Sequence, residues 1–88
     1  MTGKRTQYED LIISVIERIK GRLPDDRERY TDKPLTGAPW NMVAEDLVYL
    51  VLELMKETGI RFAAEDFDGM KMNTVTGIAE VLVERDNG

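Results

Sequence analysis

The stretch GAPWNMVAEDLVYLVLELMKETGI, residues 37–60, decides the fold because it combines a clear helix start, a long apolar run and a clear stop. Asn41 is a favourable N-cap residue, since its side-chain oxygen accepts a hydrogen bond from a backbone N–H that the helix start leaves unpaired. Gly59 followed by Ile60 is typical of a Schellman ending, in which the glycine adopts the left-handed conformation. These signals predict a helix over residues 42–58.

The apolar side chains of this predicted helix cover more of its circumference than a core requires. At 100° per residue, one sector is enough to face a core, yet further apolar residues widen the arc to roughly 200°. The core sector contains Val43, Leu47, Leu50, Val51 and Leu54, and the widening residues are Ala44, Val48, Leu52 and Met55. Either the helix is central and covered on both sides, or part of the second group stays exposed for a partner with a basic rim.

A second helix is predicted upstream of this stretch. Thr6 and Glu9 have the spacing of a capping box, in which two side chains satisfy backbone donors at a helix start. Apolar residues then recur at one-face helical spacing up to Ile19, and Gly21 supplies the stop. The pattern predicts a helix over residues 7–20.

The C-terminal third contains a short segment and a last helix. Residues 63–69 are expected to form one helical turn with Phe67 and Met70 facing inward. Asn73 or Thr74 then caps a helix whose apolar stripe has i, i+3, i+4 and i+7 spacing. The stripe consists of Val75, Ile78, Ala79 and Leu82.

A long polar connection, residues 21–39, joins the first two predicted helices. Its charges, prolines, threonines and glycines are typical of a surface loop. A structureless connection of this length is unusual in a compact domain, so it is either functional or contains a short helical turn near residues 24–30. Leu23, Tyr30 and Leu35 are its expected anchors to the core.

No strand alternation competes with these helical patterns. The sequence therefore predicts an all-α bundle of three longer helices and one short helix, with a long loop between the first two. We expect a single domain over residues 1–88 with its core at about residues 7–84. A domain of this size buries only about 60% of the surface that its unfolded chain exposes, so its stability is modest.

The composition limits the functions to be considered. Seventeen acidic and twelve basic residues give a net charge of −5, and the basic residues do not cluster, so we expect no nucleic-acid binding. Without Cys or His, the chain lacks thiol nucleophiles, the commonest general base and the commonest transition-metal ligand. No apolar stretch approaches the ~20 residues of a membrane span. We expect a cytoplasmic protein that is not an enzyme and does not bind a membrane.

Two weak chemical signals do not change that expectation. The acidic stretch 65–69 resembles part of a calcium-binding EF-hand loop, but Ala64 and Val75 would stand at the first and last ligand positions without a side-chain oxygen. The only serine, Ser14, lies among apolar neighbours in the first helix, which is a poor position for a nucleophile. The sequence predicts no metal site and no catalytic residue.

The order of the predicted elements and several short motifs resemble the acyl carrier protein family, which includes the peptidyl carrier domains. The motifs are Glu57-Thr58-Gly59-Ile60-Arg61-Phe62, Glu65-Asp66-Phe67 and Asn73-Thr74-Val75, followed by Ile78-Ala79 and Leu82. The resemblance implies a four-helix bundle with a long first loop, a recognition helix over residues 42–58, a short third helix and a closing fourth helix.

Members of that family carry phosphopantetheine on a serine at the start of the recognition helix, and this chain has no serine there. Counting from Gly37 places Trp40 near the attachment position, whereas counting back from Gly59 places Ala44 there. Thr36 is the nearest hydroxyl, but it precedes the turn and has no flanking motif. The resemblance therefore implies no cofactor-binding residue, and the chain is similar to the serine-less acyl-carrier-related proteins of peptide-maturation systems.

The resulting hypothesis is a binding module that docks onto a biosynthetic or peptide-modifying enzyme with a basic docking surface. The docking residues that the resemblance implies are Trp40, Met42, Glu45, Asp46, Val48, Tyr49, Leu52 and Glu53. Trp40 is alternatively a buried anchor that holds the loop on the bundle. Two other functions stay open: a genuine phosphopantetheine-dependent acyl or aminoacyl carrier, and a structural subunit that self-associates through Val48, Leu52 and Met55. We expect a monomer, with a weak dimer as the alternative.

Overall fold

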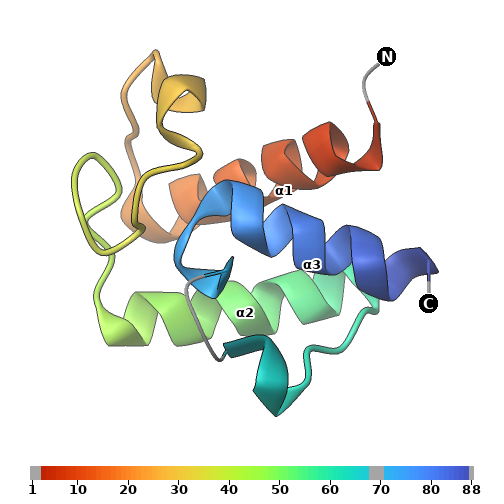
Figure 1. Ribbon diagram of the computed structural model, residues 1–88. Coiled ribbons are helices and arrows are strands. Elements are labelled where there is room, and N and C mark those ends of the chain that lie inside the picture. The colour runs from red at the N-terminus through yellow and green to blue at the C-terminus, as the bar shows by residue number, and fades with distance from the viewer. Residues whose placement is uncertain (1–2, 68–70, 88) are drawn as a thin grey trace.

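The computed structural model describes residues 3–67 and 71–87, and helical segments contain most of them (Figure 1). Within these ranges the α-helices are α1 (Lys4–Lys20), α2 (Ala44–Thr58) and α3 (Val75–Asn87), and the 3-10 turns are η1 (Arg27–Tyr30), η2 (Ala64–Phe67) and η3 (Lys71–Asn73). The described ranges contain no strand, so the predicted all-helical class is confirmed. The short fourth helix is not confirmed, because only the 3-10 turns η2 and η3 are found between α2 and α3.

α1 packs against both α2 and α3, and the connection between α1 and α2 closes one end of the bundle (Figure 1). Two backbone hydrogen bonds tie this connection to the region where α3 begins. The Leu35 N–H donates to the Asn73 carbonyl oxygen at 2.7 Å, and the Thr76 N–H donates to the Thr31 carbonyl oxygen at 3.0 Å. The long connection is therefore part of the folded unit, although it contains no α-helix.

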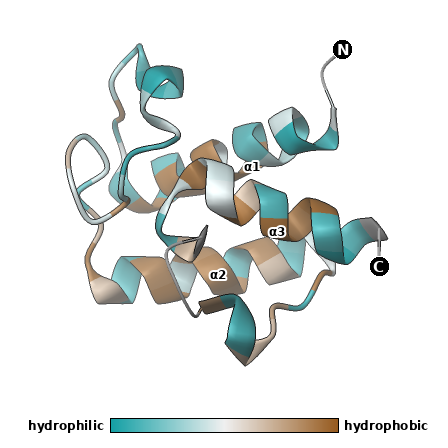
Figure 2. Cartoon of the chain, viewed as in Figure 1, coloured by the Kyte–Doolittle hydropathy of each residue, from teal (hydrophilic) through white to brown (hydrophobic). Residues whose placement is uncertain are grey.

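The core lies between the three labelled helices and this connection, and hydrophobic residues recur along each helix (Figure 2). Its buried residues are Ile12, Ile13, Val15, Ile16, Leu23, Leu35, Trp40, Met42, Leu50, Leu54, Val75, Ile78, Ala79 and Leu82. Leu23 and Leu35 are buried and Tyr30 packs against the core cluster that contains them, which confirms the predicted anchors. Burial of a large aliphatic or aromatic side chain stabilises a fold by about 1.5–3 kcal/mol. The connection therefore contributes to stability as the helices do.

The start of α1 differs from the prediction. α1 begins at Lys4, so Thr6 lies inside the helix and the predicted capping box does not form. The Glu9 carboxylate instead accepts a hydrogen bond from the Thr76 hydroxyl of α3 at 2.9 Å. The Lys4 ammonium forms an ion pair of 2.7 Å with Asp86, near the end of α3. Both contacts join the first turns of α1 to α3, and no local sequence pattern indicates them.

The C-terminal end of α2 lies where the glycine signal places it, at Thr58 followed by Gly59. Gly59 has a left-handed φ of 72°, and its N–H donates to the Met55 carbonyl oxygen at 2.8 Å. The Ile60 N–H donates to the Thr58 hydroxyl oxygen at 3.0 Å rather than to a helix carbonyl. The helix therefore ends in the simpler single-bond left-handed motif, not in the predicted Schellman motif.

The predicted start of the last helix is confirmed, whereas the short segment before it is oriented differently. The Thr74 hydroxyl accepts a hydrogen bond from the Gly77 N–H at 2.9 Å, which is the expected capping contact. Phe67 does not face inward, because its side chain is 48% exposed and its ring packs edge-to-face against Phe62 at a centroid distance of 6.2 Å. The inward position predicted for Met70 lies outside the described residues.

Candidate functional site

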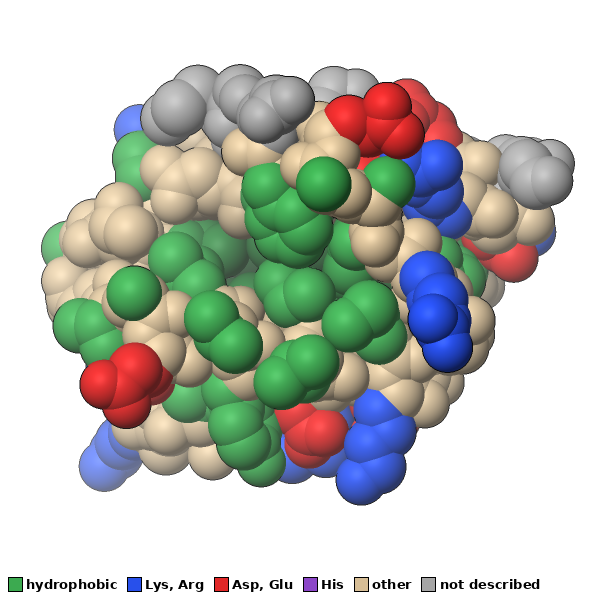
Figure 3. Space-filling model, turned by 90° about the horizontal axis from the view of Figure 1, so that it is seen from below, with side chains coloured by type: hydrophobic (Ala, Val, Ile, Leu, Met, Phe, Trp, Pro, Cys, Tyr) green, Lys and Arg blue, Asp and Glu red, His purple; other side chains and the backbone are tan. Residues whose placement is uncertain are grey.

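The most unusual surface of the molecule is the outward face of α2. Val48, Tyr49 and Leu52 are 60%, 54% and 55% exposed, although large apolar side chains usually contribute to a core. Hydrophobic side chains gather on this face, with acidic and basic groups at its edges (Figure 3). We call the exposed residues Glu45, Val48, Tyr49, Leu52 and Lys56 the outer stripe of α2.

A groove lies beside the outer stripe, between α2, η2 and the start of α3. It has a volume of about 450 Å³, and its lining is mainly apolar, with Val51 and Leu52 on one side and Phe67 and Met72 on the other. Figure 3 shows the hollow in the middle of the hydrophobic area. Groove and stripe together form one apolar surface, which is the kind of area that marks an interaction site on a small protein.

The sequence allowed two interpretations of the apolar arc of α2, a helix covered on both sides or a helix with part of the arc exposed to a partner, and each holds for part of the arc. Leu50 and Leu54 are fully buried, so one side of α2 faces the core. Val48 and Leu52 are exposed as the docking interpretation requires, whereas Met55 is half-buried.

The turn before α2 corrects the predicted docking set. Trp40 and Met42 are only 1% and 2% exposed, so neither side chain is available to a partner. The Trp40 indole N–H donates to the Tyr30 carbonyl oxygen at 3.0 Å while its ring lies in the core. The docking roles predicted for these two residues are wrong, and the alternative that Trp40 anchors the loop is confirmed.

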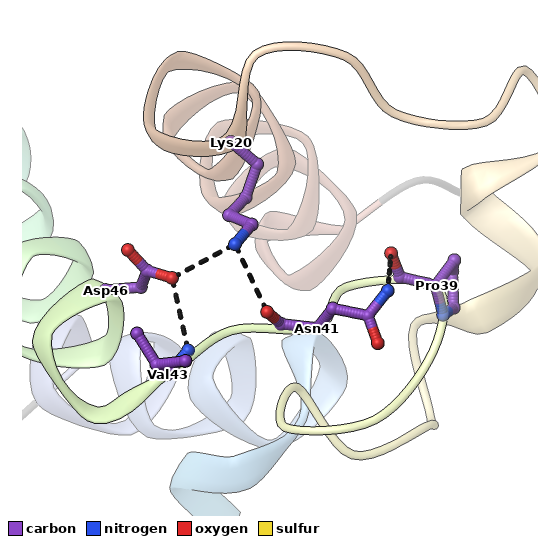
Figure 4. Close-up of polar contacts among 5 residues, drawn as sticks. All are labelled: Lys20, Pro39, Asn41, Val43 and Asp46. Atoms are coloured by element: carbon purple, nitrogen blue, oxygen red, sulfur yellow. Dashed lines mark hydrogen bonds and ion pairs between the residues drawn. The ribbon is translucent and has the colours of Figure 1, made fainter.

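A polar cluster fixes the N-terminus of α2 (Figure 4). The Lys20 ammonium, at the end of α1, donates to the Asn41 carbonyl oxygen and to the Asp46 carboxylate, both at 3.2 Å. The same carboxylate accepts a hydrogen bond from the Val43 N–H at 3.1 Å. Asn41 itself has a left-handed φ of 51° and precedes the N-cap residue Val43, so the predicted N-cap role of Asn41 is wrong and α2 begins at Ala44.

These contacts change the part that Asp46 plays in the predicted docking set. The hydrogen bond from the Val43 N–H and then the Lys20 ammonium hold the pKa of Asp46 below its usual range. Its negative charge is compensated within the molecule, and its side chain is only 21% exposed. Glu45 and Glu53 form no ion pair within the described part of the chain, so they are the acids available to a partner.

The structure also separates the two candidates for the missing serine position. Trp40 is inside the core, whereas Ala44 is the exposed first residue of α2. Ala44 has a methyl group and no hydroxyl, so it offers no attachment point for a phosphopantetheine arm. Thr36 is exposed in the connection before α2.

The acidic stretch and the serine that the sequence singled out as weak chemical signals both form contacts within the chain. Arg85 of α3 lies 2.6 Å from Asp66 and 3.9 Å from Glu65, so these acids bind a cation of the chain itself. The Ser14 hydroxyl donates to the Leu11 carbonyl oxygen within α1 at 2.8 Å. Across residues 3–67 and 71–87, no cluster of three or more potential metal-ligating side chains is present.

Comparisons with known proteins identify no relative: no family model, no curated protein and no solved structure matches the chain. None of the described helices is long and apolar enough to cross a membrane. Any inference about function therefore depends on the geometry of α2 and of the adjoining turn.

Sequence reasoning missed three contributors to this surface. Lys20 neutralises Asp46 across a separation of 26 residues, for which the sequence has no local signal. Phe67 of η2 lines the groove together with residues of α2, an arrangement that also depends on tertiary structure. The position of Lys56 on this surface could have been predicted from the sequence. Lys56 follows Glu45 by 11 residues, which is about three helical turns, so both residues lie on the same face of the helix.

Proposed function

We propose that the chain is an acyl-carrier-protein-like docking module, without a phosphopantetheine arm, that binds a biosynthetic or peptide-modifying enzyme through the outward face of α2. The observation that carries the proposal is the exposure of Val48, Tyr49 and Leu52 on one helix face. Large apolar side chains at the centre of an exposed patch are typical of residues that dominate binding energy at interfaces.

The order of elements supports the resemblance on which this proposal draws. α2 follows a long ordered connection, as the recognition helix does in carrier proteins, and a left-handed glycine ends it. The absence of a hydroxyl at Ala44 supports a module that recognises a partner without carrying cargo. The chain itself acts as a binding protein in this proposal, not as an enzyme.

The charges around the face define the kind of partner. Glu45 and Glu53 are the acids of α2 without an ion pair in the described chain, and the whole chain has a net charge of −5. A partner with an apolar centre and basic groups around it would complement the acidic part of this surface. Such charge complementarity mainly raises the association rate and excludes wrong partners.

The absence of the arm is tested by coexpression with a promiscuous phosphopantetheinyl transferase. We expect the intact mass of the chain to remain unchanged, because neither Ala44 nor Trp40 offers a hydroxyl group. A conventional carrier protein expressed in parallel must gain the arm, which controls for transferase activity. A mass increase that maps to Thr36 would overturn the proposal and establish the alternative of a genuine carrier.

Docking is tested by photo-crosslinking in the native cells. A photoreactive residue at Leu52 is expected to crosslink to an enzyme of a biosynthetic or peptide-modifying pathway. The same residue at Glu28, which is exposed on η1, should not crosslink to that enzyme. Equal crosslinking from both positions, or none from Leu52, contradicts docking through α2.

A further inference from the structure

We infer that the outer stripe of α2 is also self-complementary, so that two copies of this chain pair through antiparallel α2 helices related by a two-fold axis. This inference does not rest on the proposed function, because it concerns the purified chain alone. In the purified chain, where no partner enzyme is present, it specifies a second copy of the same chain as the occupant of the outer stripe.

The stripe has its charges at opposite ends. Glu45 lies in the first turn of α2 and Lys56 in the last turn, with Val48, Tyr49 and Leu52 between them. Eleven residues span about 16 Å along a helix and return to within about 20° of the same direction. Acid, apolar centre and base therefore follow one another along a single exposed line.

Neither charged end has a partner in the described part of its own chain. No ion pair or side-chain hydrogen bond involves Glu45 or Lys56 in the described part of the molecule, although two ion pairs link α2 or its N-terminus to α1 nearby. Lys20 and Asp46 form one such pair, and Arg18 and Glu57 form another at 3.6 Å. The stripe thus presents two free charges of opposite sign.

An antiparallel arrangement satisfies both charges at once. If the two-fold axis passes near the middle of the stripe, Glu45 of each copy lies opposite Lys56 of the other copy. Tyr49 and Leu52 then meet across the axis, where their apolar surface is removed from water. A parallel arrangement would place Glu45 against Glu45 and Lys56 against Lys56, which is unfavourable at close range.

The size of the surface fits a weak dimer. A stable interface removes about 800 Å² from each partner, and the whole accessible surface of this chain is 5575 Å². A stripe along one helix, extended by the edge of the groove at Phe67, covers a limited part of that surface. We therefore expect an association that depends on protein concentration and leaves a monomer at high dilution.

Sedimentation velocity over a wide concentration range tests the inference. We expect the wild-type chain to convert from monomer to dimer, and Leu52→Glu to remain monomeric. Glu45→Lys and Lys56→Glu should each raise the dissociation constant by about tenfold or more, because each creates two like-charge pairs. Circular dichroism of the variants checks that α2 remains helical, since Glu45 also stabilises the helix N-terminus.

The charge swap makes the test specific for the antiparallel register. The double variant Glu45→Lys/Lys56→Glu should restore the wild-type dissociation constant, because both cross-pairs are again opposite in sign. A mixture of the two single variants should form a heterodimer more readily than either variant forms a homodimer. Asp10→Lys and Arg22→Glu make the same changes of net charge at exposed positions outside α2, and should leave dimerisation unchanged.

Three results would overturn the inference. The first is a wild-type chain that stays monomeric throughout the concentration range. The second is a dimer that the single charge reversals do not weaken, or that the double reversal does not restore. The third is a loss of dimer in the Asp10→Lys control as large as that in Glu45→Lys, which would assign the effect to net charge alone.

Discussion

Trp40 joins the connection between α1 and α2 to the core by two kinds of contact. Its ring is buried among apolar side chains, and its indole N–H donates to the Tyr30 carbonyl oxygen. A buried tryptophan needs such a partner for its polar N–H. The requirement explains why this aromatic residue, for which the sequence allowed either a docking role or an anchor role, serves as an anchor in the interior.

Replacement of Trp40 by Phe removes the indole N–H and part of the ring volume. We expect a loss of about 1–3 kcal/mol in the free energy of unfolding, from the lost hydrogen bond and the space left behind. Urea denaturation followed by circular dichroism measures the change. Tyr49→Phe, at an exposed aromatic residue, is the control and should change stability by less than about 0.5 kcal/mol. Equal effects of the two variants would contradict the anchor role.

Asp46 is expected to make the stability of the folded chain depend on pH, and its contacts determine whether stability rises or falls with pH. Its pKa is lowered in the folded chain by the Val43 N–H and by Lys20, so the folded state favours the charged form. The stabilisation is fully present at pH values above the pKa that Asp46 has in the unfolded chain. It is lost as the pH falls through the lowered pKa that Asp46 has in the folded chain.

We expect Asp46→Asn to lower the melting temperature at neutral pH, and the difference from wild type to shrink as the solution is acidified below the usual aspartate range. Thermal melts over a series of pH values measure this. Glu45→Gln removes a neighbouring carboxylate that has no ion pair, and should show a smaller pH-dependent difference. A constant difference between Asp46→Asn and wild type at every pH would contradict the charge-based explanation.

α2 has one face that builds the fold and another that is free for contacts. Leu54 is fully buried, whereas Leu52, two residues earlier, is 55% exposed. Leu54→Ala should therefore cost about 2–5 kcal/mol in the free energy of unfolding, because it leaves a cavity in the core. Leu52→Ala should cost less than about 0.5 kcal/mol in a dilute, monomeric sample. Denaturant titrations of both variants test this, and equal losses would mean that α2 is rotated from the described orientation.

The end of α2 depends on a backbone conformation that favours glycine. Gly59 has a φ of 72°, and an added Cβ atom would meet no atom within 4 Å, so the cost of a side chain lies in the backbone itself. Gly59→Ala should reduce the free energy of unfolding by about 1 kcal/mol. Gly37→Ala is the matched control, because its added Cβ makes only ordinary contact with the Pro34 carbonyl oxygen at 3.7 Å. A larger loss at Gly37 than at Gly59 in denaturant titrations would contradict this explanation.

The sequence predicted the helices because their periodicity is local, and it predicted their ends less well because tertiary contacts decide them. The stop at Gly59 and the cap at Thr74 follow from short-range backbone requirements, and both are confirmed. The first turn of α1 contacts α3 through the ion pair of Lys4 with Asp86, which is distant in sequence. For the same reason, the sequence left two alternatives open both for Leu52 and for Trp40. Exposure of Leu52 and burial of Trp40 are decided by how the connection and the other helices pack.

At the scale of the whole molecule, the long connection acts as a structural part of the bundle. Leu35 is fully buried, its N–H donates to the Asn73 carbonyl oxygen, and its own carbonyl oxygen accepts a bond of 2.9 Å from the Met42 N–H. One residue thereby links the connection, the turn before α2 and the region before α3. Release of the connection would therefore also disturb the surface that α2 presents.

Leu35→Ala should cost about 2–5 kcal/mol in the free energy of unfolding, as expected for a fully buried leucine. Because a domain of this size has modest stability, the variant should be partly unfolded near room temperature. Circular dichroism during urea titration measures the loss. Thr36→Ala, at the exposed neighbouring residue, is the control and should behave as wild type. A fully stable Leu35→Ala would mean that the connection contributes little to the fold.

The burial of Trp40 gives the molecule an intrinsic optical probe. It is the only tryptophan in the chain, and its indole lies in the core with a single hydrogen bond to the connection. Its emission spectrum therefore reports the polarity at one known point, where the connection meets the bundle. A red shift while the helical signal persists would reveal a state in which the connection has detached and α1, α2 and α3 remain formed. The rate of such detachment can thus be followed without any attached dye.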